Sequence, residues 1–294
     1  MREKFIDKSF SSASLATIET LSAIVADYQA QGYRLSLRQL YYQMVARDLV
    51  ENSIQSYKRI GNLVNDARLA GLIDWDMIED RGRETITPPM WRNPADIVQA
   101  AASQFAIDRW ADQGNHVEVM VEKAALEGVL IPVCRELGIR FTANRGYSSS
   151  STMYEAGKRL EHYTNEKNVY ILYLGDDPSG IDMTRDVRER LTLFSGSTVE
   201  VKRLALNYDQ IEEYHPPENP AKMTDSRASA YVVEFGMSSW ELDALNPDTL
   251  ATLVRDVVVD LRDETLWDMA LEREAEMRAE LEAFAKNYGK ARKK

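Results

Sequence analysis

Residues 170–183, YILYLGDDPSGIDM, carry the strongest sign of the fold. Their β-branched and aromatic start predicts a buried strand, and the Pro-Ser-Gly sequence after Asp176 and Asp177 predicts a turn into a helix. Residues 116–125, HVEVMVEKAA, likewise place Glu122 at the end of an apolar strand. If both strands belong to one parallel sheet, the three carboxylates meet at its carboxyl edge, where open α/β sheets carry their sites.

The segments around these two stretches alternate between strand-like and helix-like patterns. We expect strands at 117–121, 140–143, 169–174 and 199–204, and helices at 96–112, 124–137, 152–163, 181–193 and from 248 onward. Short connections between alternating strands and helices predict a parallel sheet covered by helices on both faces. The expected class is therefore α/β, with additional C-terminal helices.

The N-terminal third has a different pattern. Apolar residues at helical spacing predict helices at 11–31, 37–49 and 57–71, with Ser36 and Ser56 as caps of the second and third. Residues 72–86 alternate and contain turn residues, which favours a β-hairpin. Three helices and a hairpin predict a winged helix. We expect a DNA-binding domain over residues 1–95 and a metal-binding α/β domain over 96–294.

The third helix of a winged helix normally enters the major groove of DNA. Here it and the following wing carry side chains suited to phosphates and base edges, namely Lys58, Arg59, Asn62, Asn65, Arg68, Arg81, Arg83 and Arg92. The alternative is a solvated helix face without a nucleic-acid partner.

Composition limits the class of protein. The net charge of −11 argues against a uniformly basic DNA-coating protein, although residues 32–92 hold nine Lys or Arg against eight Asp or Glu. Cys134 is the single cysteine, which excludes a disulfide framework and a Cys-based zinc site. The chain has no apolar run of about 18 residues and no apolar signal core at its N-terminus. We expect a cytoplasmic, nucleoid-associated protein without membrane contact.

The helix at 37–49 contains a candidate nucleophile. Tyr41 falls within its apolar stripe, whereas Tyr42 falls at the edge of the stripe, one turn after Arg38. A neighbouring guanidinium favours phenolate, the form that a nucleophilic tyrosine needs. The alternative is that Tyr42 is a packing residue.

The acidic strand ends suit a metal ion. Three carboxylates at neighbouring strand ends repel one another unless a cation lies between them, and hard oxygen ligands favour Mg²⁺, with Mn²⁺ as the alternative ion. The competing interpretation is that Glu122 pairs with Lys123 or an arginine, while the two aspartates cap the helix that starts near Ser179.

These motifs resemble a known family. A strand ending in Glu, followed later by an Asp pair with Pro-x-Gly, is similar to the Toprim fold of topoisomerases, primases and related nucleases. The segments VEKAALEGVL, ANRGYSSSST and DDPSGIDM resemble, in that order, the topoisomerase VI A subunit and meiotic double-strand-break transesterase family. LRQLYY upstream matches the place of that family's catalytic tyrosine, and SSWELDAL is similar to its C-terminal segments.

The resemblance implies an enzyme that breaks double-stranded DNA by transesterification. Tyr42 would attack a phosphodiester and remain on the 5′ end, Arg38 would bind the phosphate, and Glu122, Asp176 and Asp177 would hold Mg²⁺. It also implies a homodimer in which two protomers share each site. The ATPase of ATP-driven strand passage would be a separate subunit, because the chain contains no ATPase module.

One departure affects the acidic motif. The family has Asp-x-Asp before Pro-x-Gly, and Gly175 stands in the first place, with Asp176 between. Because adjacent strand residues point to opposite faces, Asp176 and Asp177 can both be ligands only through a local distortion. Two alternatives therefore remain, a Toprim nuclease in which metal-activated water replaces Tyr42 and a non-catalytic winged-helix DNA-binding protein.

Overall fold

The computed structural model describes residues 2–79, 88–144, 148–176, 179–220 and 238–291. Its N-terminal elements are α1 (Ser12–Ala30), β1 (Leu35–Ser36), α2 (Leu37–Ala46), α3 (Ile54–Leu69), the 3-10 helix η1 (Trp75–Met77) and β2 (Ile78–Glu79). The middle of the chain forms α4 (Pro94–Gln104), β3 (Asn115–Val121), η2 (Ala124–Leu126), α5 (Glu127–Glu136), β4 (Arg140–Ala143), α6 (Ser150–Leu160), β5 (Asn168–Leu174), α7 (Ser179–Ser195) and β6 (Glu200–Ala205). The C-terminal elements are α8 (Tyr208–Tyr214), β7 (Glu218–Pro220), β8 (Ser238–Trp240), η3 (Leu242–Ala244), α10 (Pro247–Leu261) and α11 (Glu264–Ala291).

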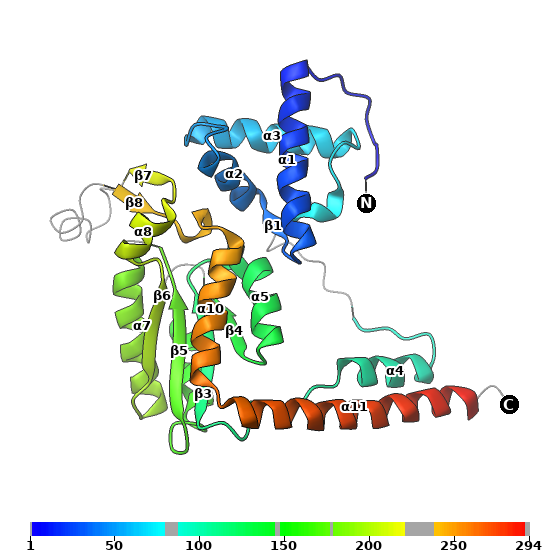
Figure 1. The fold of residues 1–294 in the computed structure, drawn as a ribbon, viewed down its shortest axis with the longest axis vertical. Helices are drawn as coiled ribbons and strands as arrows, with labels where there is room; N and C mark the ends of the chain where they lie inside the picture. The colour runs from blue at the N-terminus through cyan, green and yellow to red at the C-terminus, as the bar shows by residue number, and fades with distance from the viewer. Residues whose placement is uncertain (1, 80–87, 145–147, 177–178, 221–237, 292–294) are drawn as a thin grey trace.

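A four-stranded sheet forms the centre of the lower half of the molecule in Figure 1, in the order β4-β3-β5-β6. Every pair in this sheet is parallel. The expected α/β class and parallel sheet are therefore confirmed, and each of the four expected strands lies within two residues of its observed bounds. Because β3 and β5 are adjacent in the sheet, the residues that follow them lie side by side at the carboxyl edge.

Helices cover both faces of this sheet, because successive residues of its strands point in opposite directions. Val119 and Leu172 belong to the apolar cluster that includes α5 and α10. Met120 and Ile171, their neighbours in sequence, belong to a second cluster with α6 and α7. Two helices therefore cover each face, as expected of a parallel sheet.

The three N-terminal helices lie above the sheet in Figure 1. The segment after α3 does not confirm a hairpin. Residues 75–77 form a 3-10 turn, and β2 pairs parallel with β1, so that Leu35 lies opposite Ile78. A returning wing strand would fall on residues 80–87, outside the described residues. A winged helix stays a prediction.

Several helix boundaries differ from the expected ones; for example, the helix expected from 248 onward is interrupted between Leu261 and Glu264. Two of the differences have a clear local cause. The cap of α3 is Ser53, whose Oγ accepts the backbone N–H of Ser56 at 3.1 Å, so the helix starts earlier than predicted. The expectation that a helix runs to residue 112 was also wrong. α4 ends at Gln104, where Phe105 takes an extended conformation, and the Asp108 carboxylate accepts the Trp110 N–H in a separate turn.

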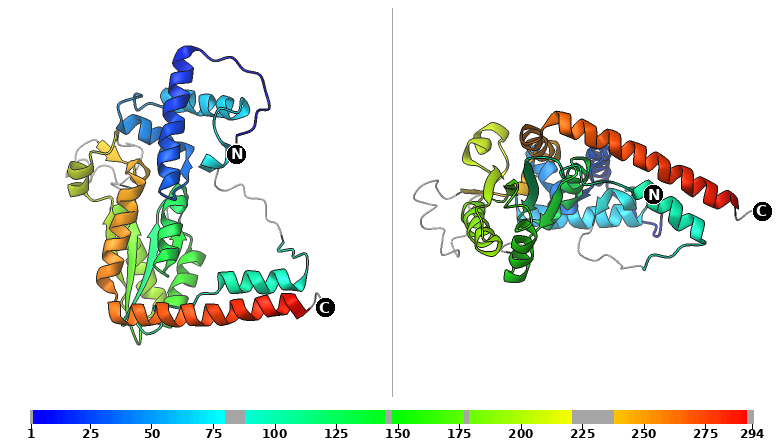
Figure 2. Two further views of the ribbon diagram at one scale, coloured as in Figure 1. Left: turned by 45° about the vertical axis from the view of Figure 1, so that its right-hand side comes forward. Right: turned by 90° about the horizontal axis from the view of Figure 1, so that it is seen from below.

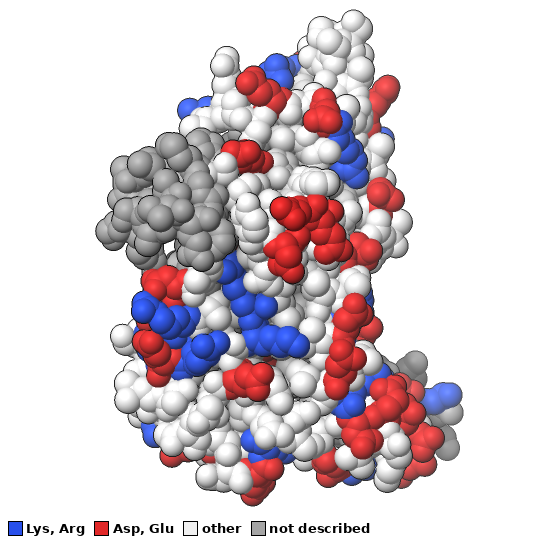
Figure 3. Space-filling view, turned by 60° about the vertical axis from the view of Figure 1, so that its left-hand side comes forward, with Lys and Arg blue, Asp and Glu red and all other residues white. Residues whose placement is uncertain are grey.

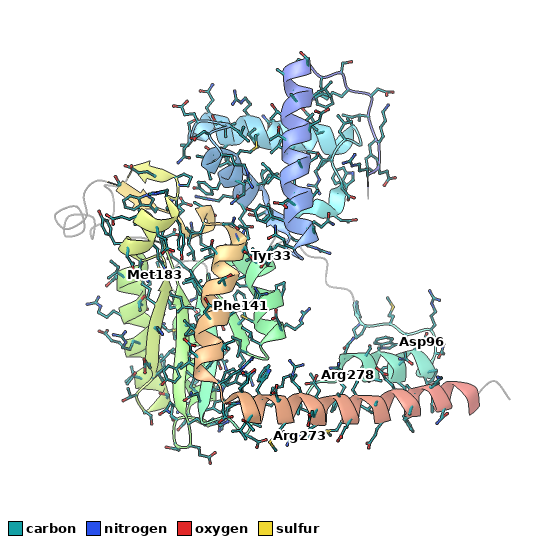
Figure 4. All side chains as sticks on the ribbon, in the orientation of Figure 1. Tyr33, Asp96, Phe141, Met183, Arg273 and Arg278 are labelled. Atoms are coloured by element: carbon teal, nitrogen blue, oxygen red, sulfur yellow. The ribbon has the colours of Figure 1, made fainter. Side chains whose placement is uncertain are left out.

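α4 and α11 lie side by side and project from the sheet as a two-helix arm, visible in both views of Figure 2. Glu274 of α11 is buried and accepts hydrogen bonds from Arg109 at 2.8 and 3.0 Å and from Arg278 at 2.7 Å. Arg278 also donates to the carbonyl of Phe105 at 2.8 Å, and it points toward the α4 side of the arm in Figure 4. Within the described ranges, no helix has the length and apolar character needed to cross a membrane.

One apolar cluster joins the N-terminal helices to the sheet. It runs from Leu21 of α1 through Leu40 and Tyr42 of α2 to Leu242 of η3, and continues to Leu172 of β5. These side chains are almost completely buried. The contact between α2 and η3 is therefore part of the core, and it fixes the position of α2 above the carboxyl edge of the sheet.

Candidate active site

Helix α2 begins in a way that orients two candidate residues. Ser36 forms a capping box with Gln39, in which each side chain binds the backbone N–H of the other residue. This fixes the first turn, from which Arg38 projects. One turn later lies Tyr42, whose hydroxyl oxygen accepts a hydrogen bond from Arg38 at 3.4 Å. The expected pairing of Arg38 with Tyr42 is present.

Tyr42 is buried, with 4% of its surface exposed, although its position in the sequence predicted the edge of the apolar stripe. Burial is the largest cause that raises the pKa of its hydroxyl, and the negative charge of Glu241 adds to it. Arg38 acts in the opposite direction without cancelling these two effects. The resting form is therefore the neutral phenol, whereas the sequence predicted that Arg38 would favour phenolate.

Tyr41 is a core residue, as predicted. It is 3% exposed, and its hydroxyl accepts the backbone N–H of Ser53 at 2.8 Å. The structure thus gives the two adjacent tyrosines different surroundings. Tyr41 anchors the start of α3, and Tyr42 faces charged groups from distant parts of the chain.

Glu122 and Asp176 meet at the carboxyl edge of the sheet. Glu122 directly follows β3, and Asp176 follows β5 with one residue between. The Glu122 carboxylate accepts the backbone N–H of Asp176 at 2.9 Å. Burial raises the pKa of Asp176 to about 6, and the charge of Glu122 contributes while Lys123 opposes. Asp177, the third predicted ligand, lies outside the described residues.

Lys123 joins these acids to two others that the sequence analysis did not select. Its Nζ lies 2.8 Å from Asp176 Oδ2, 2.8 Å from Glu241 Oε2 and 2.9 Å from Asp243 Oδ1. The lysine pKa is raised, because these carboxylates outweigh the effect of its burial. Lys123 is therefore a permanent cation held among three carboxylates.

Glu241 connects this group to α2. Its carboxylate pairs with the Arg38 guanidinium, which also donates to the Tyr42 hydroxyl. Asp243 Oδ2 lies 3.2 Å from Arg38 Nε. Burial acts to raise the pKa of Glu241, but Lys123, Arg38 and Tyr42 together hold it below its usual value.

We refer to these seven side chains as the charged cluster: Arg38, Tyr42, Glu122, Lys123, Asp176, Glu241 and Asp243. Its contacts run without interruption from the phenol of α2 to the carboxyl edge of the sheet, within one chain. The segment SSWELDAL, which carries Glu241 and Asp243, was noted for its resemblance, and that was the available signal for these two acids.

The cluster offers hard oxygen donors to a metal ion, although Lys123 supplies one positive charge already. Among the residues that the structure describes, no three His, Cys, Asp or Glu side chains form a group ready to hold a metal. Glu122 and Asp176 nonetheless lie close enough for the charge of Glu122 to raise the pKa of Asp176. Two neighbouring carboxylates of this kind fit Mg²⁺ in their chemistry.

The predicted DNA-binding residues are divided by the structure. Lys58, Arg59, Asn62 and Asn65 are exposed on α3, and Arg59 and Asn62 line a groove of about 590 Å³ with Glu51 and Gln55. Arg68 instead packs over the Trp75 ring at 4.4 Å and donates to the Trp75 carbonyl at 2.7 Å, which holds η1 against α3. Arg81 and Arg83 lie outside the described residues.

The face shown in Figure 3 is not uniformly basic. On the face shown in Figure 3, Lys and Arg gather near the middle of the molecule, with Asp and Glu above, below and beside them. This mixed pattern agrees with the net charge of −11.

No protein-family model matches this chain, and no curated protein matches it in sequence. A functional interpretation therefore depends on the motifs and on the geometry of the charged cluster.

Proposed function

We propose that the protein is a metal-dependent enzyme that breaks double-stranded DNA through Tyr42, with a winged-helix module and a Toprim-like domain as in the topoisomerase VI A subunit and meiotic transesterase family. The observation that carries the proposal is the unbroken series of contacts from Tyr42 through Arg38, Glu241 and Lys123 to Asp176. A phenol, two cations and the acidic edge of a parallel sheet are brought together from segments up to about 200 residues apart. A purely structural tyrosine has no need of such surroundings.

The chain's own residues supply most of the chemistry. The Tyr42 oxygen attacks the phosphorus, the bond from phosphorus to the 3′ oxygen breaks, and the strand's 5′ phosphate becomes joined to tyrosine. Tyr42 loses its proton and the departing 3′ oxygen gains one. Arg38 neutralises the charge that develops on the phosphate oxygens. Glu122 and Asp176, with Asp177, would hold Mg²⁺, which when bound supplies further positive charge for those oxygens.

Contacts within one chain favour a site that a single protomer completes, in contrast to the shared site that the resemblance implies. A homodimer would then serve to cut both strands of a duplex. Lys58, Arg59 and Asn62 of α3 are the proposed duplex contacts, because they are exposed on one helix. An ATPase partner and nucleoid association remain part of the proposal through the resemblance alone.

The burial of Tyr42 gives a specific reason to consider a second function. A phenol with 4% exposure and a raised pKa is a poor nucleophile unless its surroundings open. In a Toprim nuclease, metal-activated water would attack the phosphate, and Tyr42 would only position Arg38 and Glu241.

One trapping experiment separates these functions. Supercoiled DNA is incubated with the protein and Mg²⁺ or Mn²⁺, quenched with detergent, and examined for protein joined to DNA 5′ ends. We expect a covalent product that Tyr42→Phe abolishes and Tyr41→Phe retains. Nicking without linkage, retained in Tyr42→Phe, would instead support the nuclease, and DNA binding without breakage would leave only a binding protein.

A further inference from the structure

Glu241 lies where a phosphate oxygen would be expected. Its carboxylate is bound at once by the Arg38 guanidinium and the Lys123 ammonium. These are the kinds of donor that bind phosphate oxygens in proteins. Arg38 also donates to the Tyr42 hydroxyl, the atom that is proposed to attack phosphorus.

We propose that Arg38 and Lys123 form a two-cation clamp for the scissile phosphate, and that Glu241 fills this clamp in the free protein. The inference rests on the proposed function and deepens it. It assigns Lys123 to the substrate and makes Glu241 a carboxylate that the DNA backbone displaces. The burial of Tyr42 then belongs to the free state of the site.

Asp243 keeps the clamp in place during the exchange. One of its carboxylate oxygens lies 2.9 Å from Lys123 Nζ and the other 3.2 Å from Arg38 Nε. A single side chain therefore sets the distance between the two cations. Its side chain is completely buried, whereas that of Glu241 is 17% exposed. Asp243 is thus a positioning residue, and Glu241 is the group that can leave.

The exchange also conserves charge. A phosphodiester carries one negative charge, as does the Glu241 carboxylate, so replacing one by the other leaves no uncompensated cation in a largely buried cluster. Glu241 lies between β8 and η3 with an extended backbone, outside any helix or strand. Its side chain can turn outward by rotation about its own torsions, which leaves the backbone hydrogen bond from Ala244 to the Glu241 carbonyl in place.

The test measures binding without breakage. The affinity of the full-length protein for a short fluorescent duplex is measured by anisotropy in EDTA, for the wild type, Glu241→Gln and Glu280→Gln. Glu280 is exposed on α11 and serves as the matched loss of one negative charge. Removing the competing carboxylate is expected to tighten binding about tenfold in Glu241→Gln, and Glu280→Gln should match the wild type.

A second arm tests the part played by Lys123. In the double variant Glu241→Gln with Lys123→Gln, the gain in affinity should disappear. Unchanged or weaker binding by folded Glu241→Gln would overturn the proposal, as would a gain that survives the loss of Lys123. If Glu241→Gln does not fold at the assay temperature, Glu241→Ala is measured in its place.

The result is independent of the covalent step. Tighter binding without any covalent product would leave the clamp standing as a DNA-backbone site and remove the transesterase. A covalent product with unaltered Glu241→Gln affinity would keep the transesterase and remove the clamp.

Discussion

The buried carboxylate of Glu118 allows a quantitative test of how the sheet is stabilised. Glu118 lies on β3 with its side chain fully buried, and it accepts hydrogen bonds from Arg159 at 2.8 and 3.1 Å. His116 Nε2 lies 3.0 Å from the same carboxylate, and Arg140 Nε lies 3.7 Å from it. Breaking a fully buried ion pair costs about 3–5 kcal/mol. Because Arg159 is 31% exposed and its charge is partly screened, we expect Glu118→Gln to lose about 2–3 kcal/mol.

The pH dependence identifies the charge as the cause. Burial acts to raise the pKa of Glu118, but His116 and Arg159 outweigh it and hold the pKa below its usual value. A carboxyl group whose pKa is lowered by folding stabilises the fold above its unfolded pKa and loses this contribution as the pH falls through its folded pKa. The difference in free energy of unfolding between wild type and Glu118→Gln should therefore have its maximum value at pH 7 and decrease below about pH 4.

Thermal unfolding followed by circular dichroism provides the measurement. For a chain of this length, a loss of about 2–3 kcal/mol lowers Tm by about 5 °C. Glu161→Gln, which removes an exposed carboxylate on the same side of the sheet, is the control and should leave Tm near the wild-type value. The ion-pair argument would be refuted if Glu118→Gln lowered Tm by a similar amount at pH 7 and pH 3.5, or by no more than the control variant does.

Three further predictions concern the site and its supports. Glu122→Gln should abolish metal-dependent DNA cleavage while duplex affinity in EDTA is retained; if cleavage persists, Glu122 is not part of the site. Lys58→Ala should reduce the salt slope of DNA binding by about one unit, whereas Arg68→Ala should leave the slope unchanged and lower stability by about 1–2 kcal/mol through its contacts with Trp75. Gly157→Ala should cost about 1–3 kcal/mol in urea unfolding, because the added Cβ would lie 3.1 Å from the carbonyl carbon of Phe194 and closer still to its Cβ; an unchanged or stabilised protein would show that α6 and α7 can separate at this point.

The sheet could be predicted because each of its strands is recognisable from a short stretch of sequence. Strands β3 and β5 are continuous apolar runs, and the acids that follow them end up adjacent because the strands pair directly. Ser36 was identified as a cap from its place before an apolar helix, and the structure confirms it. Ser53 was missed because Ser53 and Ser56 are both good caps, and the choice depends on packing that buries Ser56.

The rest depended on contacts distant in sequence. Residues 72–86 alternate as a hairpin would, yet residues 78–79 pair in parallel with residues 35–36, and no local pattern predicts that pairing. Glu241 and Asp243 reach Arg38 across about 200 residues, so nothing in either segment predicts the pairing. The depth at which Tyr42 lies depends on the same contact between α2 and η3.

The apolar cluster that runs from α1 to β5 limits how the chain can be divided. If the chain were expressed as two fragments cut near residue 95, each would leave part of this shared interior facing water. We therefore expect the fragments to aggregate alone and to recover structure when refolded together. The separation between the Tyr42 phenol and the acidic edge is then set by packed side chains and not by a hinge, so under the proposed function we expect the duplex to adapt to this spacing.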